Sequence, residues 1–174
     1  MDETIRQEML ALLPRLRRFA YGLTGSMDEG DDLVQATCER AVRHIDSWQP
    51  GTRLDSWMYR IARNTYLNRL RAQRVRGEHL QPVELDRHVN VDGVGQMDAR
   101  LTFAAVRRLI ERLPEEQRAV LLLVCVEGLA YREVAAALDL PIGTVTSRLA
   151  RARMTLKNLL EGADDAPDAN VETS

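Results

Sequence analysis

Apolar residues recur at helical spacing along the first part of the chain. The first stripe contains Ile5, Met9, Leu12, Leu16, Phe19 and Leu23. Steps of three and four residues are typical of an amphipathic helix with one buried face. Pro14 interrupts this stripe, and it either kinks the helix or begins a new one at its first turn. The sequence therefore predicts a helical N-terminal segment.

The same period predicts further helices at about 28–45, 54–74, 98–113 and 115–127. A turn is expected at 49–52, where the sequence reads Gln-Pro-Gly-Thr. In the third helix, the predicted buried positions are Trp57, Met58, Ile61, Ala62 and Thr65. No segment has the alternation of a confident strand, so the predicted fold class is all-α.

The helical period disappears between residue 76 and about residue 96, where Pro and Gly are frequent. We therefore expect two small helical domains, at 1–75 and 98–161, joined by a flexible linker at 76–97. Residues 162–174 are polar and acidic, and we expect a disordered tail there.

Residues 131–159 predict a helix-turn-helix, in which Val134 and Leu138 face Val145 and Leu149 across a turn. Asp139 occupies the turn, where Asp tolerates left-handed geometry better than most residues. At the start of the first of these helices, Ala130 stands where a Ser or Thr cap is favoured. This would leave Glu133 without its capping-box partner.

The outer face of the second helix predicts contact with DNA, because no acid lies between Pro141 and Leu160. We expect Ser147 and Arg151 to contact base edges and Thr144, Arg148 and Arg153 to hold phosphates. The alternative is a plain helical hairpin with a solvated basic face.

A second basic face lies on the predicted third helix and carries Arg60, Arg63, Leu67, Arg71 and Arg74. Near it are residues suited to stacking on or hydrogen bonding with unpaired bases: Trp48, Trp57, Tyr59, Asn64 and Tyr66. Taken by itself this face is better explained as a solvated helix surface, and Trp57 is better explained as core. On the second helix, Asp32, Gln35 and Glu39 form a polar stripe that is either solvated or a docking surface for a basic partner.

Charge is segregated along the chain of 174 residues. The net charge is −2, but residues 161–174 hold five acids and no base, and the remainder has 24 bases against 21 acids. Cys38 and Cys125 fall within apolar stripes and are expected to be buried thiols. No metal-ligand spacing, phosphate loop or catalytic motif occurs, so we expect a non-enzyme without cofactors. Neither a signal peptide nor a membrane-spanning run is found, which favours the cytoplasm and no membrane insertion.

Four segments together resemble the extracytoplasmic-function (ECF) sigma factors of bacterial RNA polymerase. They are DDLVQATCERA at 31–41, DSWQPGTRLDSWMYRIARNTYLNRLRAQR at 46–74, LPEEQRAVLLLVCVEGLAYREVAAAL at 113–138 and LPIGTVTSRLARARMTLKNLL at 140–160. The resemblance covers about residues 10–160, and its PGT at 50–52 is similar to the general-stress subgroup.

The resemblance implies a promoter-specificity subunit of core RNA polymerase, with its two domains corresponding to sigma regions two and four. The implied docking residues for the clamp helices of the largest subunit are Asp32, Gln35 and Glu39. The implied minus-ten residues are Trp48, Thr52, Arg60, Arg63, Asn64 and Arg71. The implied minus-thirty-five residues are Thr144, Thr146, Ser147, Arg148, Arg151 and Arg153.

The implied partners are core polymerase, through its clamp helices and flap, promoter DNA and a cognate anti-sigma factor. Two other hypotheses remain open from the sequence. One is a sigma mimic that sequesters an anti-sigma factor, and the other is a stand-alone helix-turn-helix regulator, which usually needs a dimer.

Overall fold

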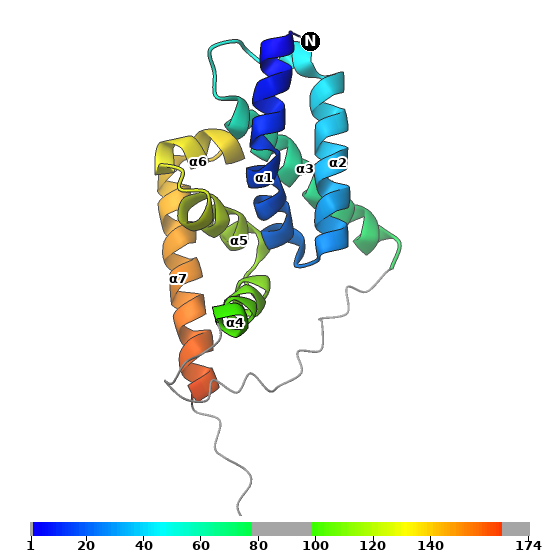
Figure 1. The fold of residues 1–174 in the computed structure, drawn as a ribbon. Coiled ribbons are helices and arrows are strands. Elements are labelled where there is room, and N and C mark those ends of the chain that lie inside the picture. The colour runs from blue at the N-terminus through cyan, green and yellow to red at the C-terminus, as the bar shows by residue number, and fades with distance from the viewer. Residues whose placement is uncertain (1, 78–98, 165–174) are drawn as a thin grey trace, which may run out of the picture.

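The computed structural model describes residues 2–77 and 99–164, and within these ranges every regular element is helical (Figure 1). In chain order the elements are α1 (Glu3–Thr24), α2 (Met27–Arg43), η1 (Ile45–Ser47), α3 (Leu54–Val75), α4 (Ala99–Glu111), α5 (Glu115–Leu121), η2 (Leu122–Val126), α6 (Tyr131–Leu138) and α7 (Ile142–Asp164). The all-α prediction is confirmed. The predicted linker falls almost entirely outside the described residues, as do residues 165–174 of the predicted tail.

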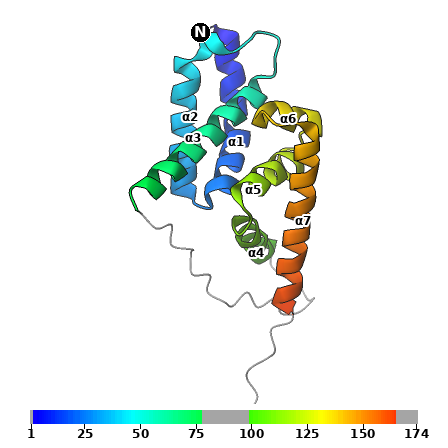
Figure 2. The ribbon, with the colours of Figure 1, turned by 180° about the vertical axis from the view of Figure 1, so that it is seen from behind.

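Helices α1, α2 and α3 form an N-terminal bundle, in which α1 and α2 run antiparallel and α3 crosses both (Figures 1 and 2). The connection between α1 and α2 needs Gly25, whose φ of 73° lies in the left-handed region. Ser26 then caps α2, since its side chain accepts a hydrogen bond from the N–H of Glu29. Pro14 lies inside α1, so the helix continues through it rather than starting anew. Leu10 and Pro14 are both exposed, and water can satisfy the carbonyl that proline leaves without a donor.

Helices α4 to α7 form a C-terminal bundle that contains the predicted helix-turn-helix. Val134 and Leu138 of α6 are buried, as are Val145 and Leu149 of α7, and the two helices pack on each other. Asp139 ends α6 with φ 54° and ψ 53°, the left-handed geometry expected of it.

Two details of this bundle correct the sequence predictions. Ala130 offers no capping side chain, yet its N–H donates to the Glu133 carboxylate at 2.8 Å, so half of a capping box forms. At the other end of the motif, α7 continues to Asp164, into the segment expected to be a disordered tail from residue 162.

The predicted helix at 115–127 is not uniform, because α5 gives way to the π-helical turn η2. There the N–H of Glu127 donates to the carbonyl of Leu122, five residues earlier, at 3.0 Å. A π turn inserts one residue and rotates the later side chains relative to an α-helical face. Cys125 is consequently exposed, and the prediction that it is buried was wrong; Cys38 is only partly buried.

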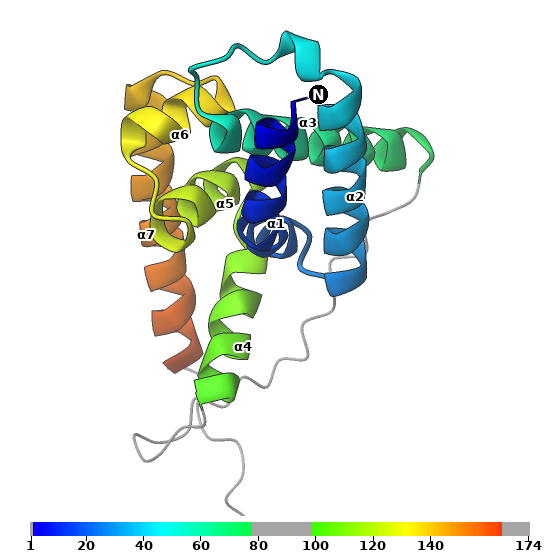
Figure 3. The ribbon, with the colours of Figure 1, turned by 45° about the horizontal axis from the view of Figure 1, so that its top comes forward.

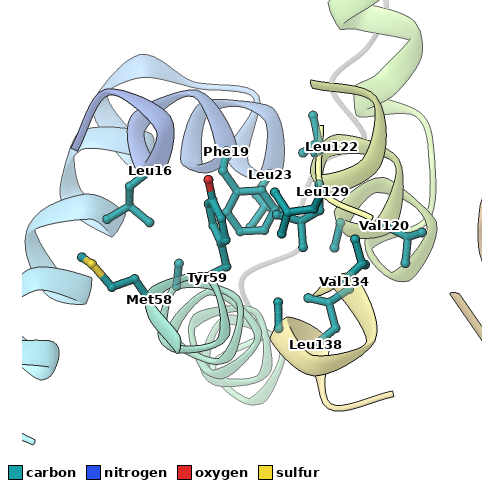
Figure 4. Close-up of a cluster of buried hydrophobic side chains, with 14 of the residues drawn as sticks. Leu16, Phe19, Leu23, Met58, Tyr59, Val120, Leu122, Leu129, Val134 and Leu138 are labelled. Atoms are coloured by element: carbon teal, nitrogen blue, oxygen red, sulfur yellow. The ribbon is translucent and has the colours of Figure 1, made fainter. Parts of the chain in front are cut away.

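The two bundles pack directly on each other and share one apolar core (Figure 4). Phe19 of α1 and Tyr59 of α3 meet edge to face, with ring centroids 5.1 Å apart. Leu16 and Met58 of the N-terminal bundle lie on one side of this pair, and Leu129, Val134 and Leu138 of the C-terminal bundle lie on the other. α6 lies along α3 and α5 lies against α1, as Figure 3 also shows. The protein is therefore closed, with both halves contributing to a single interior.

Candidate DNA-binding and polymerase-docking surfaces

The second helix of the helix-turn-helix separates a buried face from an exposed face. Val145, Leu149 and Ala152 are buried against α5 and α6. The opposite face is exposed and contains Thr146, Ser147, Arg151 and Arg153, with Thr144 half-buried beside them. The spacing of the apolar residues in the sequence is what turns these polar residues outward. Ser147 and Arg151 are four residues apart and so lie on the same side of the helix.

Arg148 differs from the expectation that it lies on this outer face. Its side chain is 18% exposed and pairs with Glu116 of α5 at 2.9 Å. Arg148 therefore joins two helices of its own bundle in this conformation. The helical period alone could not reveal this, because the partner lies on another element.

The minus-ten candidates lie in two places, the loop before α3 and the outer face of α3. In the loop, the Thr52 hydroxyl donates to the Gln49 carbonyl at 2.7 Å, which fixes a tight turn next to Gly51 at φ 87°. Trp48 is half-buried at the start of the loop. Thr52 itself is exposed.

Asn64 is exposed and lines two hollows on α3. The first, of about 270 Å³, also includes Leu67, Asn68 and Arg71. The second, of about 200 Å³, lies between α3 and the end of α2, and its lining is Arg40, His44, Ser47, Trp57, Ile61 and Asn64. The structure thus brings Asn64 and Arg71 together on one polar, open surface.

Arg60 and Arg63, by contrast, face the C-terminal bundle. Arg60 donates to the backbone carbonyl of Ala136 in α6. Arg63 pairs with Glu115 of α5 at 3.0 Å, and these two side chains are only 12% and 13% exposed. The minus-ten candidates on α3 are Arg60, Arg63, Asn64 and Arg71. Two of them, Arg60 and Arg63, therefore already have partners within the protein in this conformation.

Two aromatic residues suggested for base stacking are not free. Tyr59 is 1% exposed, and burial, followed by the charge of Glu127, raises the pKa of its hydroxyl. Its proposed stacking role was wrong, because this side of α3 is buried in the core shared by the two bundles. Tyr66 is half-buried, and burial is the main cause that raises its pKa. Trp57 packs against the core, as expected.

The polar stripe of α2 is accessible. Asp32, Gln35 and Glu39 are all exposed, and the Gln35 amide donates to the Glu39 carboxylate at 3.1 Å. Leu33, Val34 and Thr37, on the other side of the helix, are buried. This stripe is a negatively charged surface of one helix on the side turned away from the core.

No group of three potential metal ligands occurs among residues 2–77 and 99–164. Within these same ranges, no helix has the length and apolar character needed to cross a bilayer.

Comparison with known proteins identifies the two bundles. The family model for Sigma-70 region 2 matches residues 9–76, and that for Sigma-70 region 4 matches residues 103–156. The ECF RNA polymerase sigma factor EcfG of Rhodopseudomonas palustris is 36% identical over 174 residues, covering 98% of this chain and 94% of that protein. This chain is an ECF sigma factor of RNA polymerase. SigW of Bacillus subtilis, another member, is 27% identical over 157 residues and covers 84% of this chain and 83% of its own.

Solved structures of sigma factors have the same fold. The sigma factor RpoE of Bartonella quintana, in complex with the anti-sigma factor NepR, aligns with a TM-score of 0.74 at 30% identity, covering 92% of this chain and 98% of that one. CnrH, in complex with the cytosolic domain of CnrY, aligns with a TM-score of 0.65 at 25% identity and covers 90% of each chain. The anti-anti-sigma factor PhyR of the same Bartonella species, in its complex with NepR, aligns with a TM-score of 0.60 at 20% identity; 90% of this chain and 50% of that one are covered, which shows a shared fold only.

Proposed function

We propose that this ECF sigma factor contacts the minus-thirty-five promoter element through the exposed face of α7. The observation that carries the proposal is the division of this helix into a buried apolar face and an exposed face with two arginines and two hydroxyls. Ser147 and Arg151 contact base edges, and Thr144, Thr146 and Arg153 contact phosphates and the neighbouring groove edge. Arg148 adds a phosphate contact when it leaves Glu116.

The loop before α3 and the open end of α3 capture the minus-ten element. Thr52, Asn64 and Arg71 are the exposed members of this set and Trp48 is half-buried beside them. The two hollows beside Asn64 suit unstacked bases. Arg60 and Arg63 extend the same face along the helix, and they join the DNA contacts once the two bundles separate.

The stripe of Asp32, Gln35 and Glu39 on α2 docks on the clamp helices of core RNA polymerase, and the region-four bundle contacts the flap. The carboxylates of Asp32 and Glu39 are exposed, while the other side of α2 is buried in the core and holds the helix in place. This gives a basic partner a fixed acidic surface to bind. The domain limits are 1–75 for the docking and minus-ten domain and 98–161 for the minus-thirty-five domain. The protein acts in the cytoplasm, where the polymerase is.

An anti-sigma factor controls the protein. The support is the likeness to RpoE of Bartonella quintana and to CnrH, whose structures were determined with NepR and with the cytosolic domain of CnrY. A role in the stress response is part of this proposal, and its support is the resemblance of the PGT at 50–52 to the general-stress subgroup.

Reciprocal variants in reconstituted transcription test the two binding surfaces. Arg151→Ala should lower promoter-specific transcription roughly tenfold, since one bidentate arginine–guanine pair contributes about 1–3 kcal/mol. It should leave affinity for core polymerase unchanged. Replacing Asp32 and Gln35 together with alanine should do the reverse and weaken core binding without changing which promoters are used. The assays are abortive initiation on a library of genomic promoters and fluorescence anisotropy with labelled core enzyme.

Arg107→Ala is the matched control, because Arg107 is an exposed arginine on α4 that pairs with Glu111 of the same helix. If Arg151→Ala and Arg107→Ala behave alike, α7 is not the minus-thirty-five contact. If the protein directs no start-site selection at all, a sigma mimic is the better explanation. A footprint on a palindrome without polymerase would instead indicate a stand-alone regulator.

A further inference from the structure

The carboxylate of Glu127, just after η2, is enclosed by the N-terminal bundle. The Glu127 side chain is 0% exposed. Its Oε2 accepts hydrogen bonds from Arg15 Nε at 3.2 Å, from Arg18 at 3.0 Å and from the Tyr59 hydroxyl at 3.2 Å. Its Oε1 accepts a further bond from Arg18 Nε at 3.1 Å. We call these four residues the Glu127 cluster.

All three partners of the Glu127 side chain in this cluster come from α1 or α3, across the boundary between sigma regions two and four. A buried carboxylate is tolerated only where charged and hydrogen-bonding groups replace water. Arg15 also lies over the Tyr59 ring, with its guanidinium carbon 5.9 Å from the ring centroid. Burial lowers the pKa of Arg15, but Tyr59, Glu127 and Asp55 together outweigh this and hold it above its usual value. Arg15 therefore stays charged in the cluster, and Tyr59 stays protonated as a donor.

The same closure occupies residues proposed to contact the minus-ten element. Arg60 donates to Ala136, and Arg63 is nearly buried against Glu115. Arg53, in the loop that leads into α3, pairs with Glu133 of α6. In the closed chain all three arginines have partners in the region-four bundle.

We propose that the Glu127 cluster is a latch that holds regions two and four together in an autoinhibited form, in which Arg60 and Arg63 are withheld from DNA. Its consequence for DNA rests on the proposed function of α3; the latch itself does not. Apolar packing between the bundles favours closure without regard to orientation. The Glu127 cluster adds directed, charge-assisted hydrogen bonds that form only when the two bundles meet in this register. A ligand that binds the open form better, such as polymerase with promoter DNA, shifts the equilibrium by its difference in affinity.

Glu127→Gln is the main test, because glutamine keeps the shape of the side chain and removes the charge. In the open form Arg15 keeps its pair with Asp55 of the same bundle and Arg18 faces water, so the substitution weakens closure selectively. We expect the open-to-closed ratio of the full chain to rise roughly tenfold, the size associated with losing hydrogen bonds to a charged group. Small-angle X-ray scattering measures this ratio against a radius of gyration of about 16 Å for a compact chain of this length.

Glu161→Gln is the matched control, because Glu161 is exposed and pairs with Lys157 on its own helix. Arg18→Ala is a second test variant: its side chain is 52% exposed, so truncation leaves the core intact if Glu127→Gln unfolds in circular dichroism. Scattering profiles of Glu127→Gln or Arg18→Ala that match Glu161→Gln and the original chain would overturn the latch.

The inhibitory consequence has its own measurement, the affinity of the isolated full chain for a single-stranded minus-ten oligonucleotide. The apparent affinity for DNA is proportional to the fraction of molecules in the open form, which can bind. A chain that is open more often should therefore bind the oligonucleotide several-fold more tightly. An opened Glu127→Gln chain with unchanged affinity would refute the inhibitory role while leaving the latch intact. Failure of the proposed function is distinguishable, since it would abolish DNA binding in every variant, including the control.

Discussion

Helices α1 and α2 approach each other closely at Gly30, where a substitution sets two opposing effects of known size against each other. A Cβ added at Gly30 would lie 2.1 Å from Cδ1 and 2.7 Å from Cε1 of Tyr21, and 3.3 Å from the Tyr21 backbone Cα. Rotation of the ring would break the hydrogen bond from its hydroxyl to Asp31 at 2.9 Å, and it would not relieve the close contact with the Tyr21 backbone. Gly30→Ala therefore forces α1 and α2 apart or moves Tyr21 out of its place.

Alanine also removes a penalty, since glycine in a helix costs about 0.8–1 kcal/mol relative to alanine. Overpacking of a fitted interior costs about 1–3 kcal/mol. The clash is therefore expected to win, and Gly30→Ala should lower the free energy of unfolding by about 1 kcal/mol. For a chain of this size that corresponds to a Tm lower by about 3 °C.

Gly143 supplies the matched control. It lies in the first turn of α7, and an added Cβ there meets nothing within 4 Å. Gly143→Ala keeps the propensity gain without the clash and should raise Tm by up to about 3 °C. Thermal unfolding followed by circular dichroism, with urea titration for the free energies, measures both variants. If Gly30→Ala is as stable as Gly143→Ala, the close approach of α1 and α2 is not a constraint on this fold.

Two further tests concern titratable groups. Burial raises the pKa of Asp55, but hydrogen bonds from Arg53 and the Ser56 N–H, with the charges of Arg53 and Arg15, outweigh it and leave the pKa below 3.8. Asp55 thus stabilises the fold above its unfolded pKa, and this stabilisation is lost as pH falls from about 5 through its folded pKa. Urea midpoints of Asp55→Asn should approach those of the original chain as pH falls below about 4, and a gap that stays constant with pH would contradict the assignment. Cys125 is exposed, so it should react with Ellman's reagent as the fast phase under alkaline conditions, and Cys125→Ala should abolish that phase; a fast phase that survives would contradict its exposure.

The arginines of α3 explain why its function was harder to predict than its structure. Their spacing indicated an exposed basic face, and Arg71 does lie in the open. Arg60 and Arg63 lie on that face too, yet α6 and α5 supply their partners. The same basic residues that suit a phosphate also suit a backbone carbonyl or a carboxylate, so the pattern of α3 alone could not distinguish these partners.

Local sequence determined the type and limits of most elements. Apolar residues at steps of three and four, with Gly25, Gly128 and Asp139 at helix ends, place the helices within a few residues of where they lie. This succeeds because helical hydrogen bonds and caps are made between residues close in the chain. Prediction from the helical period failed at η2. An α-helical apolar stripe would have buried Cys125, but the π turn rotates this residue outward.

The resemblance of four segments in order also predicted an ECF sigma factor from sequence, and the family models and the relative EcfG confirm that prediction. Only the tertiary structure decided that regions two and four close on each other, and which charges face inward when they do. Glu127 and Arg15 are 112 positions apart, and nothing in the neighbourhood of either indicates the other. Apolar periodicity specifies that a face is buried, but its partner depends on how whole helices fit together.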